Sequence, residues 1–261
     1  MAITVNGFTI TSIETLAGFN RETGVCELYL NELTDAKISC TEDIKEIAGK
    51  GGRIIKQIKK NKGVTVSGTS ALMSADLMAA QLGAESVFNE KTKIRTTETI
   101  VVEGTTAVTV NTAVGTVGAE IVEIRKVANN GALTDRYTQA EAAGEDKFAY
   151  NPGTKTITLP TNVKAGDFVA VIYDYETKGC TITDLSDVYG KTLYTYVTAI
   201  GVDVCDVEYK CQFVIPRLSF SGATDIEMSS DSQVTQAFEG TVLVDSCAGA
   251  DAKLFDFIVF K

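Results

Sequence analysis

The sequence contains no histidine and no tryptophan, and only three of its 261 residues are proline. Without histidine, Ser–His–Asp and Cys–His nucleophilic catalysis are excluded, and so is acid–base catalysis by an imidazole. A zinc site would need thiolates and carboxylates alone. The sequence therefore predicts no catalytic residue, no metal and no cofactor.

Catalysis would then rest on carboxylates, lysine, tyrosine or cysteine, and close carboxylate pairs such as Asp184/Asp187 and Asp203/Asp206 exist. In a chain with 34 acidic residues such pairs arise by chance, and we expect them to be solvated loop residues. The segment GKGGR, which begins at Gly49, fits neither common phosphate-binding motif. A carboxylate-dependent carbohydrate-acting enzyme stays open as an alternative, although the absence of tryptophan leaves little to stack on sugars.

Long apolar runs are also missing. No segment approaches the roughly 18 uninterrupted apolar residues of a spanning helix, and the start MAITVNGFTI lacks the features of a secretory signal. We therefore expect no membrane partner and synthesis in a cytoplasm. The cysteines have long, irregular spacings without a C-x-x-C motif, which predicts free thiols. They are Cys26, Cys40, Cys180, Cys205, Cys211 and Cys247.

Charge is distributed unevenly along the chain. The net charge is −10, but the segment Lys50–Lys62 contains six basic and no acidic residues, so the rest of the chain sums to −16. An acidic surface repels phosphate, which argues against duplex binding by the whole chain. One local basic face could still touch DNA or an acidic partner.

Short strand-like segments between turn signals dominate the sequence and predict an all-β fold. The first, ITVNGFTI, reads as a hairpin around Asn6-Gly7. Further expected strands are VCELYLNEL from Val25, and Ile100–Val102, Ala119–Val127, Thr156–Leu159, Phe168–Tyr175, Thr192–Ile200, Val207–Ile215, Leu218–Phe220, Phe238–Val244 and Leu254–Phe260.

One short helix is expected over Ala71–Leu82, with Ser70 as its N-cap and Gly83 as its C-terminal stop. Its apolar positions are typical of a helix that packs against a sheet. They are Leu72, Met73, Leu77, Met78 and Leu82.

The middle of the chain has a different composition, because it lacks cysteine and is rich in valine, threonine and glycine. Its turn-punctuated strands are typical of an immunoglobulin-like sandwich. We therefore expect a β module at residues 96–179, inserted between the two parts, 1–95 and 180–261, of a main β domain.

The basic stretch itself is ambiguous. As a helix it would gather Ile54, Ile55 and Ile58 on one side, whereas the double glycine before it and the turn-like Asn61–Gly63 favour two strands. We expect a hairpin with a lysine-rich turn at Asn61–Gly63. Three roles stay open for it: a plain exposed loop, a contact between subunits, or direct contact with nucleic acid.

A resemblance rests on the order of four segments: TEDIKEIAGKGGRIIKQIKKNKGVTVSG before the expected helix, then YKCQFVIPRLSFSG, DIEMSSDSQVTQAFEGTVLVDSC and LFDFIVF. This order resembles the major tail tube proteins of tailed bacteriophages. The resemblance covers about Val25–Gly83 and Cys180–Phe260, and it leaves the middle of the chain unmatched. It rests on the order of elements, including a strand that ends in Pro216-Arg217, rather than on one invariant motif.

The resemblance implies a tail-tube-like β-sandwich or barrel whose subunits form hexameric rings, stacked into the conduit for the genome. The implied partners are further copies of the chain, other tail proteins and passing DNA that is not bound specifically, and the implied location is the virion tail, assembled in the host bacterial cytoplasm. The alternative is a capsid decoration or other head-associated protein. The expected subunit contacts are Lys50, Arg53, Lys56, Lys59, Lys60 and Lys62.

Overall fold

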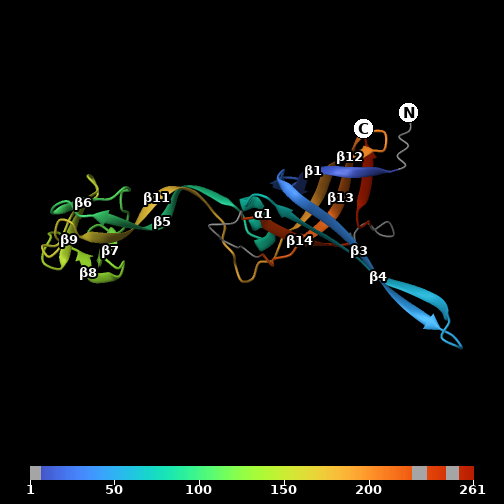
Figure 1. Ribbon diagram of the computed structural model, residues 1–261, viewed down its shortest axis with the longest axis horizontal. Helices are drawn as coiled ribbons and strands as arrows, with labels where there is room; N and C mark the ends of the chain where they lie inside the picture. Colours follow the sequence, from blue (N-terminus) through green and yellow to red (C-terminus); the bar gives the residue numbers. More distant parts are fainter. Residues whose placement is uncertain (1–6, 225–233, 245–252) are drawn as a thin grey trace. The chain divides into compact units, whose positions relative to one another are not determined.

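The computed structural model describes residues 7–224, 234–244 and 253–261. Within these residues the chain forms fifteen strands and one helix, which confirms the all-β prediction with one short helix. The contacts divide the chain into two compact units (Figure 1). Unit 1 comprises Met1–Ser86 and Ile182–Lys261, and unit 2 comprises Val87–Thr181.

Unit 1 contains an eight-stranded, strongly curled antiparallel sheet. Seven strands follow the order β2-β1-β12-β13-β14-β4-β3, and β15 pairs with β13 beside this path. The strands are β1 (Phe8–Phe19), β2 (Cys26–Leu30), β3 (Leu33–Ala48), β4 (Ile54–Ser70), β12 (Thr192–Asp203), β13 (Glu208–Phe220), β14 (Gln236–Val242) and β15 (Asp256–Phe260).

Strand β13 belongs to both parts of this sheet. Its first half, Lys210 to Val214, pairs with β15, whereas its end, Leu218 to Phe220, pairs with β14. Between the two, Pro216 and Arg217 face the single residue Tyr194 of β12, which makes a β-bulge. Because a bulge bends a strand and needs no regular N–H bond, it accommodates the proline. The sequence had suggested two separate strands here; the structure shows one bent strand.

The core of unit 1 lies on the inside of the curl. Strand β14 alternates strictly between buried and exposed residues, which places Phe238 and Val242 inside. The other buried residues of this core come from several strands and from the helix: Leu16, Leu28, Leu30, Val64, Val66, Leu77, Ala80, Leu193, Val197, Ile215, Leu218 and Phe220. The core therefore joins the sheet to the helix.

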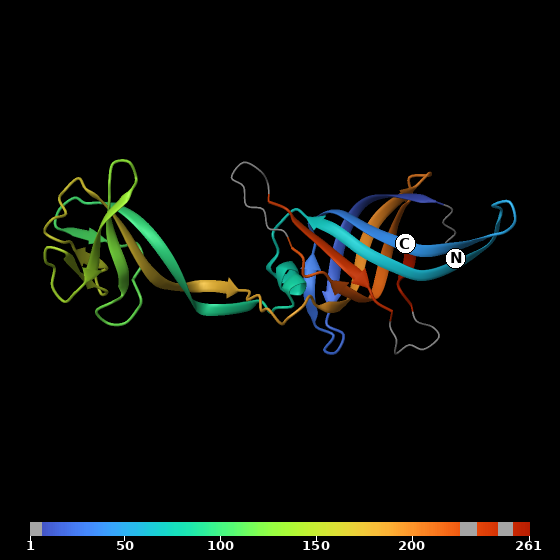
Figure 2. The same cartoon turned by 90° about the horizontal axis from the view of Figure 1, so that it is seen from below.

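Helix α1 (Ala75–Leu82) begins four residues later than the sequence suggested. Ser74, not Ser70, is the N-cap: its hydroxyl accepts a hydrogen bond from the Leu77 amide at 3.3 Å. Ser70 ends β4, and its hydroxyl instead bonds within the following turn. Gly83 ends the helix as expected, with a φ of 70°. In Figure 2, α1 lies beside the curled sheet at one end of unit 1.

The late start of α1 changes its packing face. Leu72 and Met73, expected to be buried, are 59% and 52% exposed because they precede the helix. Leu77 is fully buried. The buried Gln81 and Gln236 side chains hydrogen-bond to each other at 3.1 Å, and Gln81 also donates to the Ala237 carbonyl. These bonds fix α1 against β14.

Unit 2 forms a seven-stranded sheet in the order β5-β11-β7-β8-β9-β10-β6. The strands are β5 (Val87–Val101), β6 (Thr106–Val108), β7 (Ile121–Val127), β8 (Leu133–Gln139), β9 (Lys147–Asn151), β10 (Thr156–Thr158) and β11 (Phe168–Thr181). All pairs are antiparallel except β8 and β9. The immunoglobulin-like character expected for this module, which would mean two packed antiparallel sheets, stays a prediction, and we call unit 2 a β module.

Unit 2 has its own core, which includes Tyr137, Phe148, Ile157 and Tyr173. Ion pairs cross its two longest strands, β5 and β11. Arg95 and Lys93 both contact the Asp174 carboxylate, at 2.8 and 3.1 Å. The hydrogen bonds from Arg95, assisted by Lys93, lower the pKa of Asp174 to about 2.

Among the described cysteines, Cys26, Cys40, Cys180 and Cys205 are exposed free thiols and Cys211 is a buried one. Cys247 and the hairpin expected around Asn6-Gly7 lie at least partly outside the described residues. No helix in the described ranges is long and apolar enough to cross a membrane.

Candidate assembly surfaces

The ends of β3 and β4 extend beyond the core as a two-stranded ribbon, which we call the arm (residues 41–62). Figure 1 shows it projecting from the sheet. All its residues are exposed except Gly49 and Ile58, which are half-buried. An isolated two-stranded ribbon is at best marginally stable in water. The arm is therefore suited to being completed by a contact outside the monomer.

The turn of the arm lies at its glycines, Gly49–Arg53, and not at Asn61–Gly63 as the sequence suggested. Gly51 and Gly52 have φ values of 80° and 76°, which few other residues adopt without strain. The Gly49 amide donates to the Arg53 carbonyl at 2.8 Å and closes the turn. Asn61 lies in a β-bulge within the continuous strand β4, where its φ of 50° absorbs the extra residue.

The six basic residues predicted as subunit contacts are all exposed on the arm. Lys50 and Arg53 belong to the turn. The other four, Lys56, Lys59, Lys60 and Lys62, follow along β4. The structure thus brings them together on one projecting element, but their role as contacts stays a prediction.

Strand β3 places acidic groups beside this basic strand. Lys59 forms an ion pair with Glu42 at 2.8 Å. The Asn61 side-chain amide donates to Asp43 at 3.0 Å. The basic stretch is therefore partly neutralised within its own ribbon. The basic stretch by itself does not reveal this pairing; the signal in the sequence is the acidic TED at 41–43, which lies five residues before the turn.

Exposed isoleucines accompany the charges of the arm. Ile44, Ile47, Ile54 and Ile55 are 48%, 42%, 54% and 71% exposed. Ile55 is the extra residue of a second bulge, between the pairs Ile47/Lys56 and Ala48/Ile54. Such apolar groups gain about 25 cal/mol for each Å² that a partner removes from water. The sequence showed these residues but not that they lack a core beneath them.

Besides its end strands β2 and β3, the described part of unit 1 has sheet edges at β1 and β15. Among the described strands, residues 8–13 of β1 pair only with β12, because β2 pairs with β1 from Leu16 onward. On the other side β15 pairs only with β13 among the described strands. Within the described residues, β1, β12, β13 and β15 thus form a four-stranded sheet that is open on both sides. Open edges present N–H and C=O groups to any strand that approaches them.

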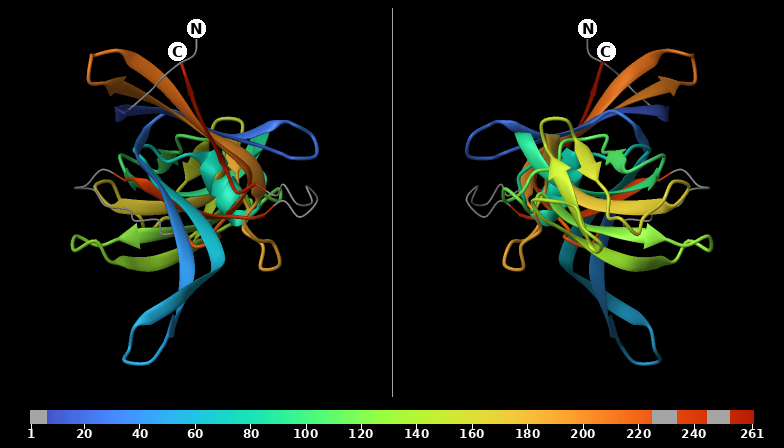
Figure 3. Two further views of the ribbon diagram at one scale, coloured as in Figure 1. Left: turned by 90° about the vertical axis from the view of Figure 1, so that its right-hand side faces the viewer. Right: turned by 90° about the vertical axis from the view of Figure 1, so that its left-hand side faces the viewer.

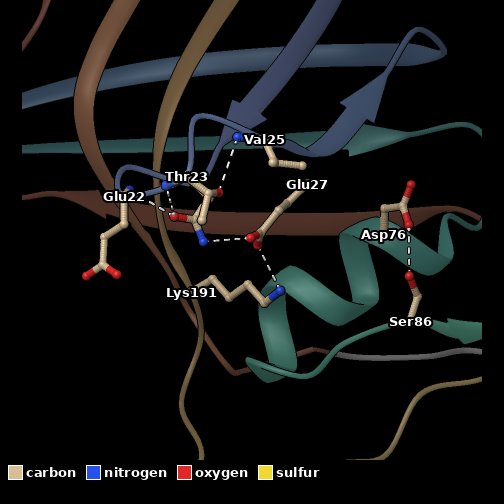
Figure 4. Close-up of polar contacts among 8 residues, drawn as sticks. Glu22, Thr23, Val25, Glu27, Asp76, Ser86 and Lys191 are labelled. Atoms are coloured by element: carbon tan, nitrogen blue, oxygen red, sulfur yellow. Dashed lines mark hydrogen bonds and ion pairs between the residues drawn. The ribbon is translucent and has the colours of Figure 1, made fainter.

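Polar contacts fasten both segments that connect unit 1 to unit 2 (Figure 4). Before β5, the Ser86 hydroxyl lies 3.4 Å from the Asp76 carboxylate of α1. Before β12, Lys191 contacts Glu27 of β2 at 2.8 Å, and Asn20 donates to the same carboxylate at 2.7 Å. Burial acts to raise the pKa of Glu27, but these two hydrogen bonds outweigh it and leave the pKa lowered.

The acidic pairs noted in the sequence show no catalytic arrangement. Asp203 accepts hydrogen bonds from the Cys205 and Val207 amides, at 2.7 and 2.9 Å, and so shapes the β12–β13 turn. No group of three or more Cys, Asp or Glu side chains within the described ranges could hold a metal ion. The prominent features of the described part of unit 1 are its sheet edges and its arm, and unpaired edges of this kind are typical of structural proteins that associate through their strands.

Comparison with protein families agrees with this class. The sequence profile of the YomU/Tube protein family matches residues 8–257, nearly the whole chain. The chain therefore belongs to the YomU/Tube family of phage tail tube proteins. This membership confirms the resemblance and implies a structural role in the tail, in a family that is typically not enzymatic. No curated protein matches the sequence.

Proposed function

We propose that the protein forms rings, of six subunits, that stack into the tail tube through which the genome passes to the host cell. The single observation that carries ring formation is the four-stranded sheet that, among the described strands, has an open edge at β1 and another at β15. If β15 of one copy pairs with β1 of the next, each subunit uses both edges, and the sheet closes into a barrel without edges.

Six of the seven basic residues of the arm are proposed as subunit contacts: Lys50, Arg53, Lys56, Lys59, Lys60 and Lys62. Unit 1 has 14 basic and 22 acidic residues, a net charge of −8. Because Lys50–Lys62 contributes +6, the rest of unit 1 sums to −14. A basic arm and an acidic body attract each other between copies. The net negative charge of the subunit also repels the DNA backbone, so that DNA passes without being bound.

Purified protein at high concentration should form rings or tubes, alone or on a tail-tip template. Negative-stain microscopy measures this directly, and tails lacking their own tube protein offer a complementation assay. Monomers that stay monomeric on concentration and fail to enter tails would overturn the proposal. Trimers or monomers that bind a capsid lattice would instead support the head-associated alternative.

Unit 2 is proposed to be an inserted domain that tube assembly does not need. Joining Ser86 to Ile182 by a short Gly/Ser linker should leave unit 1 soluble and able to assemble, because its core and both fastened connections remain. Circular dichroism and microscopy check fold and assembly. A second deletion variant, in which residue 95 is joined to residue 178 by the same linker, keeps part of the β5–β11 ribbon and serves as a control. Insoluble protein from both junctions would show that unit 2 supports the fold of unit 1.

A further inference from the structure

An aromatic patch lies on unit 1 where β1 begins and β15 runs. The ring of Phe8 covers Gly201 of β12 so closely that a Cβ there would lie 2.3 Å from the Phe8 ring. Phe8 stacks with Phe257 at 6.3 Å, and Phe257 packs on Phe213 at 4.6 Å. Phe257 is nevertheless 47% exposed. The patch therefore offers apolar surface outside the core.

Acidic residues border this patch. Phe8 pairs with Asp203, the last residue of β12, so the β12–β13 turn lies directly beside it. Asp206 and Glu208 in and after that turn are exposed, and neither forms an ion pair within the described part of the chain. We call Phe8, Phe257, Asp206 and Glu208 the acceptor surface. It combines the exposed ring of Phe257 and the half-buried ring of Phe8 with negative charge.

The turn of the arm has the complementary character. Ile54 and Ile55, which directly follow this turn in β4, are exposed beside the basic residues Lys50, Arg53 and Lys56. Figure 3 shows the arm and the β12–β13 turn, which is orange, at opposite ends of unit 1. Surfaces that match each other but lie at opposite ends of one subunit join copies head to tail, and such contacts build open stacks.

We propose that the arm of one copy binds the acceptor surface of a second copy, with Ile54 and Ile55 against Phe8 and Phe257. Lys50 and Arg53 then lie near Asp206 and Glu208 of that second copy. This contact rests on the proposed tube, in which it joins one ring to the next. We assign the partner of the arm as a second copy of the chain, because one chain carries both the strongly basic segment and the acidic surface that attracts it.

The contact gives the two kinds of side chain different tasks. Buried apolar anchors supply most of the binding energy of an interface, so the isoleucines hold the arm in place. Exposed charges mainly accelerate and orient the encounter. Lysines on β3 and β4 also discourage unwanted pairing along the open edges of the ribbon. The contact therefore depends more on Ile54 and Ile55 than on any single lysine.

Replacing both isoleucines tests the anchor. I54S/I55S should raise the protein concentration needed for tubes by more than tenfold while rings still form, since the ring edges are untouched. The matched control is V110S in unit 2, because Val110 is 73% exposed, close to the 71% of Ile55. Tubes from I54S/I55S at the wild-type concentration would overturn the anchor role.

Crosslinking tests the acceptor surface. Cys205 lies exposed in the β12–β13 turn, so K50C should place a second thiol within reach of it in the next ring. In a background with the other cysteines changed to serine, a short bis-maleimide should join copies into dimers and longer ladders only in tubes. The control K50C/C205S should form neither crosslinked dimers nor ladders.

The outcomes separate the two proposals. Tubes of K50C protein that show no crosslink to Cys205 would overturn the acceptor surface and leave the tube function standing. Wild-type protein that never forms rings or tubes would overturn the tube function and this contact together. Crosslinks that also form in dilute monomer would show random collision and count against the contact.

Discussion

Reversing four charges on the arm should abolish tube formation while the monomer stays folded. The variant is K56E/K59E/K60E/K62E, and all four side chains are exposed. Exposed ion pairs contribute about 0.2–1 kcal/mol each, so losing four of them between copies amounts to about 2 kcal/mol. That loss is more than tenfold in affinity, before the new repulsion from the acidic body is added.

The reversal also acts within the arm. K59E removes the 2.8 Å ion pair with Glu42 and brings two carboxylates together. The neighbouring residue Lys45, which pairs with Ile58, keeps its charge. Because the arm contributes nothing to the core cluster of unit 1, the melting temperature of the monomer should change little. Circular dichroism and microscopy together distinguish lost assembly from lost fold.

A matched control separates position from total charge. K91E/K147E/K164E/K178E changes four exposed lysines of unit 2, and it lowers the net charge from −10 to −18, the same value as the arm variant. It should assemble normally. Raised salt should weaken wild-type tubes, because it screens charges beyond a Debye length of about 8 Å at physiological ionic strength. If the arm variant forms normal tubes, the arm is a solvated loop. If it assembles normally but no longer shifts DNA in a mobility assay, the arm is a DNA contact.

Removing β15 should prevent ring closure. A chain that ends at Phe255 lacks the open edge at one side of the four-stranded sheet, so the β1 edge of the next copy has no partner strand. Leu254 and Phe255 pack against the core and are kept. The truncated monomer loses the contact between Phe257 and Phe213, which costs less than the roughly 1.5–3 kcal/mol of a fully buried phenylalanine.

The measurement is the oligomeric state by light scattering, together with microscopy. A chain that ends at Phe260 removes only the last lysine and is the matched control, which should form rings. If the chain ending at Phe255 still forms rings of the wild-type diameter, the ring contact does not use β15. An unfolded truncated chain would show that β15 is required for the subunit itself.

Much of the fold could be predicted because strand periodicity is local. The strand expected at Phe238–Val244 is found at Gln236–Val242, with its alternation intact. The start of α1 was wrong because two serines, Ser70 and Ser74, offer the same capping chemistry. The pairing of strands decides between the two serines: Ser70 is still paired with Gln236 of β14 at the end of β4, so the helix begins after Ser74.

The candidate site was harder to predict because it depends on pairing between strands. The basic stretch was recognisable, and so was its position in a hairpin. Its turn was placed at Asn61–Gly63 because that segment has turn chemistry, whereas the tertiary structure uses this chemistry for a bulge. The open edges at β1 and β15 depend on which strands are neighbours, a property that no local pattern encodes.

The bulge at Pro216 and Arg217 has a mechanical consequence. Strand β13 is one uninterrupted strand. It pairs with β15, the strand proposed to close the ring, in its first half and with β14, a strand of the core, at its end. A force along these strands would load the hydrogen bonds between β12 and β13 together, in shear, over ten paired residues. Tension that reached the ring contact would thus be shared along this ladder, and the subunit would resist stretching as one piece.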